Sequence, residues 1–393
     1  MSLLPVTEAQ SRLLALAPPI AGESVPLADA AGRWAASDLV ALRTQPAADL
    51  SAMDGYAIRF ADRTAPMRVI GESAAGLPFA SPVAPGEAVR IFTGAQMPAG
   101  ADCVLVQEEV ARDGDTLTLA GEGPRGPGGN VRRRGLDFAQ GDVLVAAGER
   151  LTPARLALAG VAGHAALPVR RPIRVAIAAT GDELVPPGTP LAAGQLPESN
   201  SLMIAALIAD QPVEIVPLGI LPDRLDVLTD AFAAVDADIL VTTGGASVGD
   251  HDLVRPALES AGAALDFWRI ALRPGKPMMA GRMRDTVVLG LPGNPVSAFV
   301  TSTLFLRPLI AAMAGATLPF PAKLQARLGE RLPANGERTD YLRAVLVEGR
   351  VHVAAIQDSS MLRTLARSTC LVVRAPHAPK ADSGDVVDIL MLA

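Results

Sequence analysis

The sequence has few of the residues that build metal clusters, disulfide frameworks and aromatic cores. Only two cysteines, Cys103 and Cys370, and four histidines occur in 393 residues. Two cysteines in so long a chain do not form a disulfide framework, and the Cys and His spacing fits no zinc site. We expect two buried thiols in a reducing compartment. Aromatic residues make up 3% of the chain, so its cores must be built from Ala, Val, Leu and Ile.

The sequence also lacks a strong basic character and any clear membrane segment. Its net charge is −6, and the longest basic run, at residues 132–134, is too short to follow a phosphate backbone. The first ten residues do not resemble a signal peptide. The most apolar segment, residues 296–315, is interrupted by Arg307 and Pro308, whereas a membrane span needs about 20 mostly apolar residues. We therefore expect a cytoplasmic protein with neither nucleic acid nor membrane as a partner.

The length predicts two to four domains, and the local patterns divide the chain into four parts. Short β-prone runs at 67–70, 88–92 and 103–106 lie between Pro- and Gly-rich turns, which is typical of a β-rich segment. A helix beginning at Pro153 and continuing to 169 is expected to pack on the N-terminal helix. The expected parts are a helical linker domain (1–43 and 147–171), an inserted β-rich domain (44–146), an α/β domain (172–316) and a small C-terminal β barrel (317–393).

Strands and helices alternate in the third part. We expect strands at 173–178, 213–218, 238–243 and 286–291, with helices at 200–209, 224–235 and 296–312. This order predicts a parallel sheet covered on both faces. Ligands of such sheets bind beyond the carboxyl ends of the strands, so the residues that follow each strand are the candidates for a site.

Two carboxylates follow the first of these strands. Thr180 and Gly181 lead into Asp182 and Glu183. Adjacent carboxylates at the ligand edge suit a Mg²⁺ ion that is shared with substrate phosphates. The alternative is that they form the cap and first turn of a following helix.

A Gly- and hydroxyl-rich loop follows another strand. Residues 242–250 include Gly244, Gly245 and Ser247. The backbone N–H groups of such a loop can surround a phosphate or another oxyanion. The loop matches neither a Walker A nor a GxGxxG pattern, and a flexible turn is the alternative.

Fixed cations and a Pro-flanked helix start complete the candidate site. Arg273 and Lys276 flank Pro274 and Gly275, which form a rigid turn, and fixed cations of this kind suit an oxyanion. The alternative is a run of charges that are simply exposed to solvent. The last strand leads into a helix start that offers N–H donors and a positive dipole to an anion. The residues of that start are Pro292, Gly293, Asn294, Pro295 and Ser297.

Together these segments resemble the MoeA family, which includes the E domain of gephyrin. The matching pieces lie at residues 51–57, 91–95, 131–137, 180–184, 244–249, 274–277 and 290–297. They follow the family's order through almost the whole chain. The resemblance implies a homodimer whose protomer has a linker domain, an inserted β domain, a MogA-like molybdopterin-binding α/β domain and a C-terminal β barrel.

The resemblance also implies an activity. A molybdopterin molybdenumtransferase inserts molybdate into molybdopterin adenylate and releases AMP, with Mg²⁺ as the cofactor. Contacts with other molybdenum cofactor assembly proteins are implied as well. Two alternatives remain: a MogA-type molybdopterin adenylyltransferase, which consists of the α/β domain alone, and a gephyrin-like scaffold, which has a fused N-terminal domain and a long linker that this sequence lacks.

The resemblance assigns roles to individual residues. Asp182 and Glu183 are the metal-binding or phosphate-cleaving carboxylates, and Asp54 and Asp137 join them as catalytic candidates. Thr93 belongs to the same cleft, which a second protomer would complete. The other substrate-binding candidates are Thr180, Asp223, Asp252 and the Gly- and Pro-rich residues named above. The molybdate candidates are Arg273, Lys276, Arg343 and Ser359.

The sequence departs from the family pattern at three of these places. Arg273 stands where many relatives have Lys, so the charge is kept but the geometry is not. Leu136 stands where an acid is common, so a metal role there rests on Asp137 alone. Residues 357–360 have Asp and Ser where Gly is expected.

Overall fold

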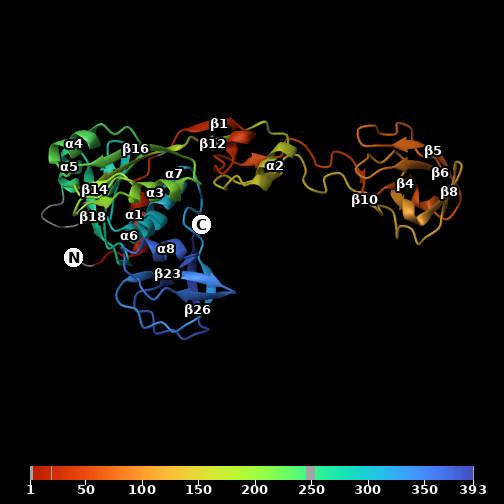
Figure 1. Cartoon of the computed structure of the whole chain (residues 1–393). Coiled ribbons are helices and arrows are strands. Elements are labelled where there is room, and N and C mark those ends of the chain that lie inside the picture. Colours follow the sequence, from red (N-terminus) through yellow and green to blue (C-terminus); the bar gives the residue numbers. More distant parts are fainter. Residues whose placement is uncertain (1–2, 19, 245–252, 393) are drawn as a thin grey trace.

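The computed structural model describes residues 3–18, 20–244 and 253–392. The molecule is elongated (Figure 1). An α/β domain and a small barrel lie at one end, the linker part lies in the middle, and the inserted domain lies at the far end. The four-part architecture expected from the sequence is confirmed.

A six-stranded sheet forms the centre of the α/β domain, in the order β16-β13-β17-β21-β20-β18. The first four strands are parallel, as expected. The last two are antiparallel and were not predicted. The strands are β13 (Ile173–Thr180), β16 (Val213–Leu221), β17 (Ile239–Thr243), β18 (Ala264–Arg269), β20 (Pro277–Met283) and β21 (Thr286–Leu291), with a small ribbon of β14 (Leu184–Val185) and β15 (Leu196–Pro197) beside them.

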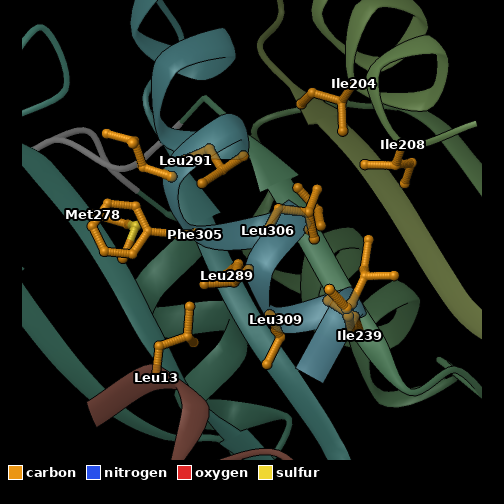
Figure 2. Packing of buried hydrophobic residues seen from close by; sticks show 14 of the residues in the cluster. Leu13, Ile204, Ile208, Ile239, Met278, Leu289, Leu291, Phe305, Leu306 and Leu309 are labelled. Atoms are coloured by element: carbon orange, nitrogen blue, oxygen red, sulfur yellow. The ribbon is translucent and has the colours of Figure 1, made fainter. Parts of the chain in front are cut away.

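Helices cover both faces of this sheet. One face packs against α4 (Leu225–Ala233) and α5 (Val254–Ser260). The other face packs against α3 (Asn200–Ile208) and a continuous helix formed by α6 (Pro295–Thr301), the π-helical turn η4 (Ser302–Leu306) and α7 (Arg307–Met313). Figure 2 shows Phe305, Leu306 and Leu309 from this helix against Leu289 and Ile239 of the sheet. The core is mainly aliphatic, as the composition predicts.

The segment 295–313 is long and apolar enough to cross a membrane by length and composition, but 83% of its most apolar window is buried inside the protein. Protein packing therefore accounts for its apolar character. Pro308 does not end the helix, because it stands in the first turn of α7, directly after the π-helical turn η4. The guanidinium of Arg307 pairs with Asp210 at 2.6 Å.

The N-terminal helix belongs to the α/β domain and not to the linker part. Helix α1 (Val6–Leu14) contacts η4 and α7, and Leu13 lies in the same core cluster. The expected packing of this helix on the helix at Pro153 is therefore wrong. Gln10 secures α1 by donating a 2.8 Å hydrogen bond to the carbonyl of Leu304.

The linker part contains more strand than expected. Helix α2 ends at Val161, because Gly163 takes a left-handed φ of +103°, and residues 166–170 form a strand paired with the N-terminal segment. The expected helix to 169 is therefore too long. The elements are β1 (Gly22–Pro26), η1 (Leu27–Ala30), β2 (Leu39–Val40), β11 (Val143–Val145), α2 (Pro153–Val161) and β12 (Ala166–Arg170).

The inserted domain is a six-stranded sheet in the order β7-β4-β6-β5-β9-β8, with a short ribbon of β3 and β10 at its root. Its β-rich character was predicted. The elements are β3 (Leu50–Ser51), β4 (Gly55–Ile58), η2 (Phe60–Asp62), β5 (Met67–Ser73), β6 (Glu87–Ile91), β7 (Cys103–Val106), η3 (Gln107–Glu109), β8 (Val110–Asp113), β9 (Thr116–Leu119) and β10 (Val131–Arg132). Cys103 is a buried free thiol, and burial raises its pKa to about 12.

The C-terminal strands close into a barrel, because β23 pairs with both β24 and β25. A two-residue strand from the α/β domain, β19 (Leu272–Arg273), pairs with β23 and joins the two domains. Cys370 is the second buried free thiol. The barrel elements are β22 (Leu324–Leu328), β23 (Thr339–Val347), β24 (Arg350–Val353), α8 (Leu362–Arg367), β25 (Cys370–Arg374) and β26 (Val386–Met391).

Candidate active site

A pocket of about 530 Å³ lies at the carboxyl ends of the parallel strands, where the sequence placed the site. Segments from the α/β domain form most of its wall, and one residue of the barrel, Ser360, completes it. The lining residues include Thr180, Glu183, Glu198, Asn200, Thr243, Gly244, Gly293, Asn294, Pro295 and Ser360. The pocket therefore brings together predicted residues from three separate loops.

The carboxylates that follow β13 do not cap a helix. Residues 184–185 form β14, and the next helix begins only at Asn200. The capping alternative is therefore wrong. Instead, Asp182 Oδ1 accepts a 3.0 Å hydrogen bond from the backbone N–H of Asp223, which ties the loop after β13 to the loop after β16.

Three acidic side chains consequently lie near one another. Burial raises the pKa of Asp223, and the negative charges of Asp182 and Glu183 raise it further. Such mutual repulsion favours a cation. The described residues contain no group of three or more His, Cys, Asp or Glu that could hold a metal ion. The site therefore fits a Mg²⁺ ion bound by one or two carboxylates together with substrate phosphates, and it does not fit an all-protein metal cage.

The raised pKa of Asp223 predicts a measurable effect on the stability of the fold. An acid whose pKa is higher in the folded protein than in the unfolded chain opposes folding once it is charged. We expect Asp223→Asn to unfold at a higher temperature than the wild type at pH 7 without Mg²⁺, with the difference shrinking as the pH falls toward 4. Thermal unfolding followed by circular dichroism at several pH values tests this. A variant that is less stable than the wild type at pH 7 would contradict the prediction that the charged Asp223 opposes folding.

The residue that follows β17 is a glycine for a steric reason. Gly244 has a φ of +95°, and a Cβ on it would lie 2.5 Å from the carbonyl oxygen of Thr180. Glycine thus lets two strand ends approach each other at the pocket floor. The other predicted residues of this segment, Gly245, Ser247 and Asp252, lie outside the described residues.

The start of α6 is less open to an anion than the sequence suggested. Pro295 has no N–H, and the N–H of Val296 donates to the carbonyl of Ser359 at 3.1 Å. Ser297 is buried. Pro292 belongs to the turn before the helix and does not line the pocket, whereas Gly293, Asn294 and Pro295 do.

Several pocket residues escaped the sequence analysis, among them Asn200 and Glu198. Asn200 Nδ2 donates to the carbonyl of Gly293 at 2.7 Å, which fastens α3 to the turn before α6. Glu198 is buried, and its Oε1 accepts from the N–H of Ser201 at 2.8 Å. An acid three residues before a helical amide resembles an N-terminal cap, and this was the signal available in the sequence.

The four molybdate candidates have different surroundings. Arg273 is paired with Asp340, whose side chain is only 4% exposed. Lys276 is exposed and makes no ion pair with the described residues. Ser359 meets α6 through its carbonyl, and its neighbour Ser360 lines the pocket.

Arg343 does not offer an open guanidinium. The residue is 1% exposed, and burial lowers its pKa. Its Nη1 and Nη2 donate to the carbonyls of Met361 and Ile356 at 3.3 and 3.4 Å. In this arrangement the guanidinium binds the protein's own backbone, so the expected direct contact with molybdate is not what the geometry provides.

The inserted domain, which carries three of the candidates, lies at the opposite end of the molecule from the α/β domain (Figure 1). Asp54, Thr93 and Asp137 do not line the pocket. Asp54 and Thr93 do belong together, because Asp54 Oδ1 accepts 2.7 Å hydrogen bonds from both the N–H and the hydroxyl of Thr93. These two bonds hold the pKa of Asp54 below its usual range.

Comparisons with known proteins cover nearly the whole chain. Residues 4–163 match the MoeA N-terminal region (domain I and II), residues 176–312 match a probable molybdopterin binding domain, and residues 325–392 match the MoeA C-terminal region (domain IV). A molybdopterin molybdenumtransferase of Haemophilus influenzae is 36% identical, with 98% of each chain covered. One of Bacillus subtilis is 32% identical over 99% of this chain and 94% of its own length.

A solved structure shows the same arrangement. The crystal structure of a molybdopterin biosynthesis MoeA protein from Pyrococcus horikoshii is 29% identical and covers 100% of both chains, with a TM-score of 0.85. The resemblance inferred from the sequence motifs is confirmed. With the curated relatives and the three matched regions in order, the chain belongs to the MoeA family of molybdopterin molybdenumtransferases.

Proposed function

We propose that the protein inserts molybdate into molybdopterin adenylate and releases AMP, and that it does so in the cytoplasm with Mg²⁺ as its cofactor. One observation carries the proposal: Asp182, Glu183 and Asp223 lie near one another after β13 and β16, and Glu183 lines the pocket. A pyrophosphate bridge requires a cation at such a place. The test is incubation with molybdopterin adenylate, Mg²⁺ and molybdate while AMP is measured. No AMP release under these conditions would overturn the proposal.

The residues divide the work as follows. Asp182 and Glu183 would hold Mg²⁺, which when bound neutralises charge on the phosphates and the leaving AMP. The Gly244 turn and the turn before α6 line the space for the pterin phosphate. Lys276 supplies a positive charge for molybdate. Cleavage by water breaks the phosphoanhydride bond, leaving AMP and a phosphate ester on the pterin. The two dithiol sulfurs of the pterin bond to molybdenum, and their two protons leave with one oxo group of molybdate as water.

The alternatives explain less of the molecule. A MogA-type adenylyltransferase would need only the α/β domain, but the matched regions extend through residues 4–163 and 325–392. A scaffold role alone would leave the carboxylates after β13 and β16 without a purpose. Contacts with other proteins of molybdenum cofactor assembly are compatible with the enzyme.

We further propose that two protomers share each active site. Asp54 and Thr93 belong to the inserted domain, which lies at the opposite end of the molecule from the α/β domain (Figure 1), so they reach a pocket only in a second copy. We expect light scattering to give about twice 40.5 kDa. The sharper test co-expresses the Asp54→Asn and Glu183→Gln variants, so that the two kinds of protomer pair at random.

Mixed dimers should regain activity. Each heterodimer carries one site with both residues intact, so random pairing restores up to about a quarter of wild-type AMP release. Each variant by itself should stay inactive. If the mixture is as inactive as its parents although heterodimers form, Asp54 and Glu183 do not act across the dimer.

A further inference from the structure

The barrel reaches the pocket through residues 356–361, which we call the strap. Ser360 of the strap lines the pocket. The carbonyl of Ser359 accepts the N–H of Val296, the second residue of α6, at 3.1 Å. This contact satisfies one of the N–H groups that a helix start leaves without an intrahelical partner. The position of the strap therefore sets one wall of the pocket and part of the environment of α6.

One side chain fastens the root of the strap to β23. Gln357 Oε1 accepts from the backbone N–H of Arg343 at 3.0 Å and from its Nε at 3.3 Å. Gln357 Nε2 donates to the carbonyls of Arg343 and Ala354 at 3.0 and 2.9 Å. A side-chain amide has two acceptor positions and two donors, and Gln357 uses all four. The amide is thereby fixed in a single orientation.

The Arg343 guanidinium holds the two ends of the strap. It donates to the carbonyls of Ile356 and Met361, the first and last residues of the strap. Gln357 in turn orients this guanidinium, because its Oε1 accepts a hydrogen bond from Arg343 Nε. Within the strap, Asp358 Oδ1 accepts from the N–H and hydroxyl of Ser360 at 2.9 and 2.6 Å. Side-chain contacts of Gln357, Arg343 and Asp358 thus order the segment, and those of Gln357 fix its root.

We propose that Gln357 is a positioning residue of the site: it holds Arg343 and the strap in the arrangement in which Ser359 meets α6 and Ser360 lines the pocket. Gln357 touches no substrate in this role. The inference rests on the proposed function, because it takes the pocket to bind molybdopterin adenylate. It differs from the expectation that Arg343 contacts molybdate, since both residues act here through the strap.

Gln357→Met is the main test, because it keeps an unbranched side chain and removes all four hydrogen bonds. Hydrogen exchange of the Val296 amide in the ligand-free protein is expected to accelerate about tenfold. The dissociation constant of molybdopterin adenylate is expected to rise about tenfold, with a smaller change in kcat. Gln357→Glu keeps the acceptor for Arg343 but loses both donors, and it should change both measurements in the same direction if Gln357→Met fails to fold.

Arg374→Met is the matched control. Arg374 is also a buried polar residue of the barrel, but the two carbonyls to which it donates, those of Pro333 and Pro379, do not belong to the strap. It should leave the exchange of Val296 and the binding of molybdopterin adenylate as in the wild type. An equal effect of Arg374→Met would mean that general loosening of the barrel is responsible, and the proposal would be overturned.

The two measurements also separate this inference from the proposed function. If the Val296 amide of a folded Gln357 variant exchanges at the wild-type rate, Gln357 does not anchor the strap. If the amide exchanges faster but molybdopterin adenylate binds as tightly as before, Gln357 is not a positioning residue of the site. A wild-type protein that does not bind molybdopterin adenylate would overturn the proposed function and this inference with it. The exchange rates would then still show whether Gln357 anchors the strap.

Discussion

Glu183→Gln is expected to lower AMP release about a hundredfold while the protein stays folded, and Asp182→Asn is expected to have a similar effect. A charged group that stabilises a transferring phosphoryl group typically contributes this much to kcat. A neutral amide of the same shape cannot bind Mg²⁺ as a carboxylate does. The measurement is the rate of AMP release at saturating molybdopterin adenylate, across a titration of Mg²⁺.

The structure sharpens what each variant should do. Asp182 also accepts the N–H of Asp223, so Asp182→Asn can disturb the loop after β16, whereas Glu183 makes no such bond among the described residues. Glu183→Gln is therefore the cleaner variant. Glu259→Gln, which removes an exposed acid on α5 of the same domain, is the control and should keep wild-type turnover. If Glu183→Gln retained turnover and Mg²⁺ dependence, the carboxylates would have no part in the chemistry.

The sequence predicted those parts of the fold that depend on local periodicity. The strands β13, β16, β17 and β21 are short apolar runs, and their alternation with helices is visible in the chain itself. β18 and β20 were missed, and in β20 residues 277–283 contain no β-branched or aromatic residue, the types that favour strands. Gly281 in β20 sits where a Cβ would lie 2.2 Å from the carbonyl oxygen of Ala264, which shows a close strand approach that a pattern of hydrophobic residues does not reveal.

The N-terminal helix shows the same limit on a larger scale. Its apolar face was recognised, but its partner was not. Gln10 bonds to Leu304, nearly 300 residues away in the sequence. Periodicity predicts which face of a helix is buried, and it carries no information about which surface covers that face.

The same limit separates the residues of the candidate site that the sequence could place from those whose surroundings it could not predict. Asp182, Glu183 and Gly244 follow strands directly, so the rule for parallel sheets was enough to place them. The surroundings of Arg273 and Arg343 depend on Asp340 and on the strap, which come from the barrel. These long-range pairs decide whether a cation is available to a ligand, and nothing in residues 269–277 indicates them.

This difference between the cations leads to the prediction for molybdate. The Arg273 charge is already compensated by Asp340, which is nearly buried, whereas Lys276 is exposed and has no acidic partner among the described residues. Gly275 packs beside α6, since a Cβ on it would lie 2.7 Å from Thr301 Cγ2. The turn that carries Lys276 is therefore held against the helix that begins at the pocket.

Lys276→Ala should consequently weaken molybdate binding more than it weakens binding of molybdopterin adenylate. The loss of one charge-assisted hydrogen bond, worth about 1.5–3 kcal/mol, corresponds to about a tenfold to hundredfold higher dissociation constant. In the proposed function the phosphates of molybdopterin adenylate lie by contrast at the Gly244 turn and the carboxylates, which the variant leaves intact. Separate titrations of the two ligands measure the difference, with Lys380→Ala, an exposed lysine of the barrel, as the control. Equal weakening of both ligands would place Lys276 in the nucleotide part of the site, and the Arg273 side of the turn would then have to release Asp340 before it could bind the anion.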